Sequence, residues 1–132
     1  MAAMARAAGA LVVFDDSQSV VNRKSAVPAL NADFYTFTGH KLYGPTGMGV
    51  LWARKALLDA MPPFMGGGDM ISTVTFERST WANVPHKFEA GTPAILETIG
   101  LGAAISWIEG RGLEQIAAHE ADITAYALER LQ

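Results

Sequence analysis

Two apolar runs separated by a glycine-rich loop constrain the fold of this chain more than any other feature. Residues 34–37 are aromatic or β-branched and residues 48–52 form a second apolar run, so both stretches are predicted to be strands. The loop between them carries Lys41 and is rich in residues that shape a backbone, namely Gly39, Gly44, Pro45 and Gly47. A backbone specified this tightly can approach a ligand closely. Lys41 is therefore a candidate functional residue, although a solvated surface lysine is the ordinary alternative.

A further strand is predicted over residues 11–14, which form a continuous apolar run ending at Asp15. Such a run is typical of a parallel strand covered on both faces. Because α/β proteins bind ligands at the carboxyl ends of their strands, we expect a site at residues 15–19.

The remaining pattern predicts an α/β chain. Helices are expected over residues 1–8 with Gly9 as the C-terminal stop, over 54–61, from Thr92 and Pro93 to Trp107 or Ile108, and along the apolar stripe from Leu113 to Leu131. Residues 73–81 alternate as a strand does, and residues 20–31 are predicted to be irregular.

Composition excludes several classes of function. The chain has 132 residues, half of them hydrophobic, with a net charge of −3 and ten scattered Lys and Arg residues, which favours one core-forming soluble domain and gives no basic surface for nucleic acid. No apolar run reaches the roughly 20 residues needed to span a membrane, and the apolar start leads into Asp15 and Asp16 without a cleavage signal, so we expect a cytoplasmic protein.

The chain contains no cysteine, which excludes disulfides, cysteine-based zinc sites and a thiol nucleophile supplied by these residues. His86 and His119 have no partners at metal-ligand spacing, so we expect no metal site. The stretch from Gly44 to Gly49 lacks the Gly-Lys-Ser/Thr ending of a phosphate-binding P-loop.

A lysine acquires catalytic chemistry when it forms a Schiff base with an aldehyde cofactor such as pyridoxal 5'-phosphate (PLP). That cofactor also needs a carboxylate at its pyridine nitrogen, a donor to its phenolic oxygen and polar groups around its phosphate. The sequence offers Lys41, Asp15 and Gln18 for the first three roles and Thr38 and His40 for the phosphate. Taken singly, these residues are also compatible with ordinary structural roles in strand ends, turns and caps.

Four segments, VVFDDSQSV, DFYTFTGHKLYGPTGMGVLW, GGGDMI and FEAGTP, resemble in their order and spacing the class V aminotransferase superfamily, and most closely its Suf-type cysteine desulfurases. The resemblance covers essentially the whole chain. It implies that residues 1–132 are part of the large domain of a fold type I PLP-dependent transferase, a three-layer α/β/α domain with a mainly parallel sheet. The rest of that domain would lie upstream and a small domain downstream.

The resemblance also implies roles for individual residues. Lys41 would bind the cofactor covalently, Asp15 would pair with the pyridine nitrogen, Gln18 would bond the phenolic oxygen, and Thr38 and His40 would contact the phosphate. Gly91 and Thr92 would complete the phosphate site of a partner subunit, which implies a homodimer.

The activity implied by the resemblance is conversion of L-cysteine to alanine, with the sulfur carried as an enzyme persulfide toward iron-sulfur cluster assembly and a sulfur-acceptor protein. In the family, the sulfur-receiving cysteine and the substrate-binding arginine lie beyond Gln132, so we expect residues 1–132 to be inactive and only marginally stable alone. The alternatives are another class V PLP enzyme, such as an aminotransferase, a selenocysteine lyase or an epimerase-like member, or a non-catalytic assembly subunit.

One position departs from the family pattern. The family usually has Asp-Gly-Ala-Gln where this chain has Asp15, Asp16, Ser17 and Gln18. Two expectations follow: the second carboxylate raises the pKa of Asp15, or it alters the turn.

Overall fold

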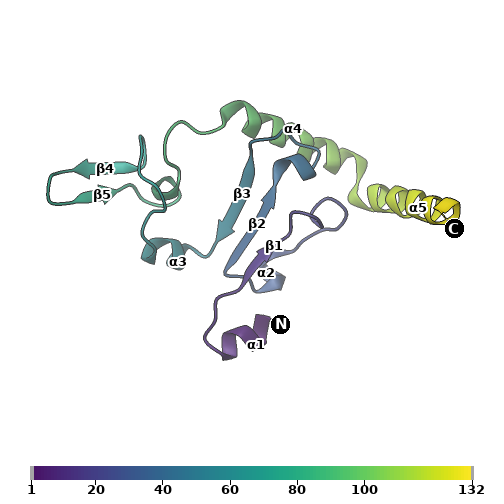
Figure 1. Ribbon diagram of the computed structural model, residues 1–132, viewed down its shortest axis with the longest axis horizontal. Helices are drawn as coiled ribbons and strands as arrows, with labels where there is room; N and C mark the ends of the chain where they lie inside the picture. The colour runs from purple at the N-terminus through teal and green to yellow at the C-terminus, as the bar shows by residue number, and fades with distance from the viewer. Residues whose placement is uncertain (1, 132) are drawn as a thin grey trace.

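The computed structural model describes residues 2–131 and confirms the α/β class (Figure 1). The strands are β1 (Val13–Asp15), β2 (Phe34–Thr38), β3 (Gly49–Ala53), β4 (Ile71–Val74) and β5 (Ser79–Trp81). The helices are α1 (Ala2–Ala7), α2 (Val27–Leu30), α3 (Lys55–Ala60), α4 (Ile95–Arg111) and α5 (Leu113–Leu131), and short 3₁₀ turns cover Gly39–Lys41 and His86–Phe88.

The central sheet has the order β1-β2-β3 and is mixed. β1 pairs with β2 in parallel, as predicted, whereas β3 pairs with β2 antiparallel. The described strands thus form a mixed sheet, which is consistent with part of the predicted fold type I domain, and β3 is its antiparallel strand. Residues 39–48 are too few to hold the crossover helix that a parallel return requires, so β3 runs back beside β2.

The core lies on one face of this sheet. Leu42, Leu101 and Ile108 are buried together, and the partly buried side chains packed against them include Phe37 and Val50 of the neighbouring strands. The other face is open among the described residues, where Val13 and Leu51 are 63% and 61% exposed. The expectation that β1 is covered on both faces is thus not met within residues 2–131.

Residues 73–81 do not form the single strand that their alternation predicts. They turn between β4 and β5, which pair antiparallel as a hairpin. The hydroxyl of Thr75 accepts hydrogen bonds from the backbone N–H groups of Glu77 and Arg78, and this local bonding closes the turn without glycine or proline.

Two other predictions differ in detail. Helix α4 begins at Ile95 after Ala94, so Thr92 is not its N-cap. Ala94 has a non-helical backbone, with φ −71° and ψ 75°, which delays the helix start beyond Pro93. Residues 20–31, predicted to be irregular, contain the short helix α2, which has Pro28 in its first turn.

A buried aspartate ties together the amino-terminal ends of β1 and β2. Asp33 accepts hydrogen bonds from Arg6 at 2.7 Å, from Arg54 at 3.1 Å and from the backbone N–H of Val12 at 2.9 Å. These contacts join α1, β1 and the start of α3 to β2, at the end of the sheet opposite to the predicted site.

The described chain is extended rather than closed on itself. In Figure 1 the β4–β5 hairpin and α5 project at opposite ends. The accessible surface is 9571 Å², whereas a compact monomer of this mass exposes about 6,700 Å². Helix α5 carries much of the exposed apolar surface, including Ile123, Tyr126, Leu128 and Leu131. None of the helices in the described part of the chain is long and apolar enough to cross a membrane.

Candidate functional site

The predicted site residues at the strand ends lie on one face of the sheet. Asp15 is the last residue of β1 and Thr38 the last of β2, and the parallel pairing brings both carboxyl ends to the same edge. Asp15 is paired with Thr36, so Asp15, Thr36 and Thr38 point to the same side by the alternation of strand residues. This is the open face of the sheet, which leaves room for a ligand.

Asp15 is exposed and ionises readily. Hydrogen bonds from Ser17, one of them from its backbone N–H at 3.0 Å, lower the pKa of Asp15, and the charge of Lys41 lowers it further. Lys41 is therefore close enough to Asp15 to act on it electrostatically. One of the two expectations was that Asp16 raises the pKa of Asp15. The charge of Asp16 does act in that direction, but it is the weakest of the effects, and the pKa of Asp15 is lowered overall.

Lys41 ends the 3₁₀ turn that follows β2, and its neighbour anchors the loop. Leu42 is buried in the core while Lys41 is exposed, because successive residues of the turn point in different directions. The backbone N–H of Gly39 donates to the carbonyl of Met48 at 2.8 Å, which closes the loop at the base of β3. The backbone of Lys41 is therefore anchored by its neighbours, while its side chain is exposed to solvent.

Close backbone contacts explain the glycines of this loop. A Cβ on Gly44 would lie 2.9 Å from the carbonyl oxygen of Gly39 and 2.9 Å from the Leu101 side chain. A Cβ on Gly39 would lie 3.0 Å from the carbonyl oxygen of Met48. A side chain at position 44 would force a neighbour to move, and one at position 39 would make an unusually tight contact, so the loop geometry favours glycine at both positions.

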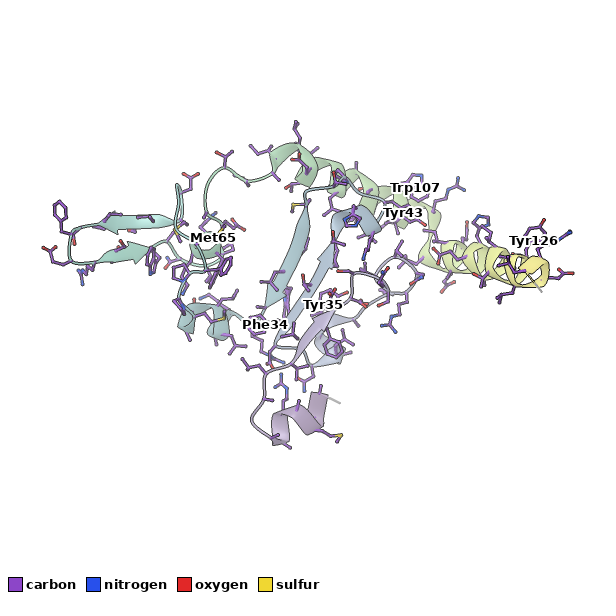
Figure 2. All side chains as sticks on the ribbon, viewed as in Figure 1. Phe34, Tyr35, Tyr43, Met65, Trp107 and Tyr126 are labelled. Carbon is purple, nitrogen blue, oxygen red and sulfur yellow. The ribbon has the colours of Figure 1, made fainter. Side chains whose placement is uncertain are left out.

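Beside the glycines, Tyr43 adopts φ 56°, a left-handed conformation that is uncommon for a bulky residue. Its ring packs edge-on against Trp107 of α4, with 5.4 Å between ring centroids, as the two labelled side chains show in Figure 2. The Arg111 guanidinium lies over the Trp107 ring, 5.7 Å from its centroid. Tyr43 was not among the predicted site residues, and no sequence pattern distinguishes its backbone conformation.

Thr38 and His40 are joined by a hydrogen bond. The Thr38 hydroxyl lies 2.8 Å from Nδ1 of His40, and the imidazole is exposed. Gln18 is exposed in the turn that follows β1, two residues beyond Asp16. The structure thus places the Thr38–His40 pair and Gln18 beside the strand ends, and their contacts with a cofactor stay predictions.

Gly91 and Thr92 lie in a second group of residues, a glycine cluster formed by Gly67, Gly68 and Gly91. The backbone N–H of Gly91 donates to the carbonyl of Gly68 at 3.0 Å, and a Cβ on Gly67 would lie 3.3 Å from the Gly91 nitrogen. Gly91 has φ +83°, which favours glycine, and Thr92 is exposed beside it. Within residues 2–131, no hydrogen bond joins this glycine cluster to the Lys41 loop.

The sequence did not reveal how Asp16 is held. Its carboxylate is buried on the opposite side of β1 from Asp15 and accepts hydrogen bonds from the hydroxyls of Ser19, Ser25 and Tyr35. The spacing of Asp16 and Ser19 is typical of a side chain that closes a turn. The second expectation, a turn that differs from that of the family, stays a prediction. The contacts with Ser25 and Tyr35 have no local sequence signal.

An open pocket of about 1120 Å³ lies on this opposite side, between the segment 20–27, β2 and the junction of α4 and α5. Its lining includes Arg23, Ser25, Tyr35 and Ile108 but neither Asp15 nor Lys41. The pocket and the Lys41 site are therefore on different faces.

The residues present fit the requirements of PLP. The strand ends offer an exposed primary amine, a carboxylate that stays ionised, an exposed carboxamide and a hydroxyl–imidazole pair, contributed by Lys41, Asp15, Gln18, Thr38 and His40. An ionised carboxylate near a reactive lysine is the pairing that this cofactor needs.

Comparisons with known proteins agree with this chemistry. The family model described as Aminotransferase class-V matches residues 1–132. A probable cysteine desulfurase of Streptomyces coelicolor is 54% identical over 127 residues, which cover 96% of this chain and 30% of that protein. The crystal structure of the cysteine desulfurase CsdA from Escherichia coli, in an S-sulfonic acid form, matches with a TM-score of 0.91 at 41% identity, covering 98% of this chain and 32% of that one.

A more distant solved structure is a C-DES variant with glycine covalently linked to its PLP cofactor, at a TM-score of 0.63 and 30% identity over 76% of this chain and 27% of that one. The chain thus spans less than a third of the length of each of these proteins. With the family model matching from the first residue to the last, this chain belongs to the class V aminotransferase family.

Proposed function

We propose that the full protein carrying this sequence is a PLP-dependent cysteine desulfurase, and that residues 1–132 supply its cofactor-binding lysine and aspartate. The observation that carries the proposal is the pairing of exposed Lys41 with exposed, readily ionised Asp15 at the carboxyl ends of adjacent parallel strands. The desulfurases similar to this chain, at 54% and 41% identity, favour this activity over the other reactions of the family.

The mechanism follows from what each side chain can do. PLP, when bound, supplies an electron sink for the carbanion that forms at the α-carbon of an amino acid. Lys41 provides the amine that binds the aldehyde, and the same Nζ moves a proton to and from the reacting carbon. Asp15 stays ionised, because Ser17 hydrogen bonds and the Lys41 charge lower its pKa, and so keeps a proton on the pyridine nitrogen.

The polar side chains near the lysine orient the cofactor. The Thr38 hydroxyl and the exposed His40 ring are donors for phosphate oxygens, and their mutual hydrogen bond fixes the ring. The Gln18 carboxamide is a donor for the phenolic oxygen. Leu42, buried directly beside Lys41, prevents the loop from moving away from this set.

Sulfur transfer needs a thiol from outside these residues. The 132 residues contain no cysteine, so the persulfide that carries sulfur toward an acceptor protein and iron-sulfur cluster assembly forms elsewhere in the full protein. The substrate we propose is L-cysteine, and the compartment is the cytoplasm.

A test of the cofactor site is reduction of the PLP-loaded full protein with borohydride, followed by peptide mapping. We expect the label on Lys41, and cysteine-dependent release of alanine and sulfide that Lys41→Ala abolishes. The matched control is Lys24→Ala, a lysine in the exposed segment before α2. Label on another lysine, or full activity of Lys41→Ala, would refute the assignment.

The second part of the proposal is a homodimer in which Gly91 and Thr92 complete the partner's phosphate site. Two observations support this part. In the described residues Gly91 is hydrogen-bonded to Gly68 and not to the Lys41 loop of its own chain, which leaves it for a site on another subunit. The accessible surface is also far larger than that of a compact monomer, so area is left for a partner to cover.

Mixed dimers test this sharing. If the site is shared, a dimer of one Lys41→Ala subunit and one Thr92→Ala subunit has one site with both defects and one with neither. We expect about half of the wild-type activity in such mixed dimers, although both parent variants are impaired. If each subunit completes its own site, mixing will restore nothing.

A further inference from the structure

The proposed chemistry uses Asp15 and Gln18 of the segment at the end of β1, but it gives no role to the buried carboxylate of Asp16 in the same segment. It directly follows Asp15 but lies on the other side of the strand, and only 6% of the residue is exposed. Both carboxylate oxygens are occupied. Oδ1 accepts from the Ser19 hydroxyl and lies 3.5 Å from the Arg23 guanidinium, while Oδ2 accepts from the Ser25 hydroxyl and from the Tyr35 hydroxyl at 2.6 Å.

These contacts close the turn and fasten it to the sheet. Ser19, Arg23 and Ser25 come from the segment that follows β1, whereas Tyr35 is the second residue of β2 and is labelled in Figure 2. The backbone of Asp16 adds three more bonds: its N–H donates to the carbonyl of Thr36 at 2.9 Å, and its carbonyl accepts from the N–H groups of Ser19 and Val20. Among the residues that the structure describes, the hydrogen bonds from the segment after β1 to β2 therefore all involve Asp16.

Two proposed cofactor contacts sit on the part of the chain that Asp16 fixes. Asp15 precedes it, and Gln18 lies between Asp16 and Ser19, the two ends of one hydrogen-bonded turn. A rotation of this turn moves the Asp15 carboxylate and the Gln18 carboxamide together. Displacements of about 1 Å in a positioning group cost up to a hundredfold in function.

We propose that Asp16 is a positioning residue for the cofactor: its buried carboxylate, held by Ser19, Ser25 and Tyr35, sets the orientation of Asp15 and Gln18 toward PLP. The inference rests on the proposed function.

The test compares Asp16 with a second buried carboxylate. Asp33 is 5% exposed and, like Asp16, accepts several hydrogen bonds, but it lies at the amino-terminal ends of the strands, away from Lys41. Asp16→Asn and Asp33→Asn are therefore matched changes, since both replace a buried anion with an isosteric amide. Tyr35→Phe is a milder change that removes one 2.6 Å donor from Asp16 and keeps the ring.

The measurements are made on the full protein loaded with PLP. They are the dissociation constant for PLP and the visible circular dichroism of bound PLP at saturation, which reports the orientation of the ring. Thermal unfolding midpoints are recorded alongside. We expect Asp16→Asn to weaken PLP binding by about tenfold or more and to change the visible dichroism. Tyr35→Phe should do both to a smaller extent, and Asp33→Asn should lower the unfolding midpoint but leave both cofactor readouts at wild-type values.

The outcomes separate the inference from the function. Wild-type protein that binds PLP on Lys41 while Asp16→Asn retains wild-type affinity and dichroism overturns the inference alone. Equal losses in Asp16→Asn and Asp33→Asn also overturn it, because they show a general stability effect. Should Asp16→Asn not fold, Tyr35→Phe decides by the same readouts. A wild-type protein that does not bind PLP on Lys41 overturns both the function and the inference.

Discussion

Protonation of Asp16 should cost the protein about 2 kcal/mol of stability at acid pH. Burial alone would raise the pKa of this carboxyl, but hydrogen bonds from Ser19, Ser25 and Tyr35 and the charge of Arg23 outweigh burial and lower the pKa from 3.8 to about 2. The difference between the folded and unfolded values corresponds to about 2 kcal/mol in favour of the ionised folded state.

The direction of the pH dependence follows from the lowered pKa. Above pH 3.8 the carboxyl is ionised in both folded and unfolded states, and its contribution to the free energy of unfolding is fully present. As the pH falls from 3.8 toward 2 the unfolded state binds the proton first, and the contribution is lost. Asp16→Asn imitates the protonated carboxyl in shape, so it should lack the contribution at every pH.

The assay is urea unfolding of the wild type and of Asp16→Asn between pH 2 and 7. The difference in free energy of unfolding should be about 2 kcal/mol at pH 5 to 7 and should approach zero near pH 2. Other carboxylates titrate in both proteins and cancel in the difference. A difference that is constant across this range would refute the reasoning, because it would mean that the loss comes from packing and not from the charge of Asp16.

Three further substitutions test the support of Lys41. Gly44→Ala should destabilise the protein by about 1–3 kcal/mol and reduce PLP attachment to Lys41, because the added methyl group meets the Gly39 carbonyl at 2.9 Å. Gly102→Ala lies in the middle of α4, where an added Cβ would have no atom of residues 2–131 within 4 Å beyond its own stretch of the helix, and should instead stabilise by about 0.5–1 kcal/mol in the same thermal and urea assays. Leu42→Ala should destabilise by about 2–5 kcal/mol and slow borohydride labelling of Lys41 in the PLP-loaded protein, whereas unchanged labelling would show that the core does not hold the loop.

The parts of the fold that the sequence predicts are those set by local pattern. Apolar runs before Asp15 and on both sides of Lys41 predict β1, β2 and β3, and the rule that ligands bind at strand carboxyl ends predicts a site at residues 15–19. The parallel pairing of β1 with β2, which the structure shows, adds Thr38 to the same edge. Glycines at positions 39 and 44 predicted a tight loop, and the close backbone contacts there are the physical reason.

Other features depend on contacts that a local pattern does not contain. The turn at Thr75 has no glycine or proline, so alternation alone extended one strand through it. Tyr35 reaches Asp16 across 19 positions of the chain, and only the parallel pairing of β1 with β2 brings them together. The antiparallel pairing of β3 with β2, in contrast, follows from the sequence, because the loop between the two strands is too short for a crossover helix.

That short return is also what makes Lys41 both rigid and accessible. Because β3 runs back at once, the backbone bond from Gly39 to Met48 closes the loop at its base, and Leu42 at its tip is buried against Leu101 of α4. Pro45 of the same loop packs against Gly100, where a Cβ would lie 3.1 Å from the proline ring. The loop that carries Lys41 is thus held against one face of α4, so a change that displaces this helix should also move the backbone of Lys41 relative to β1 and Asp15.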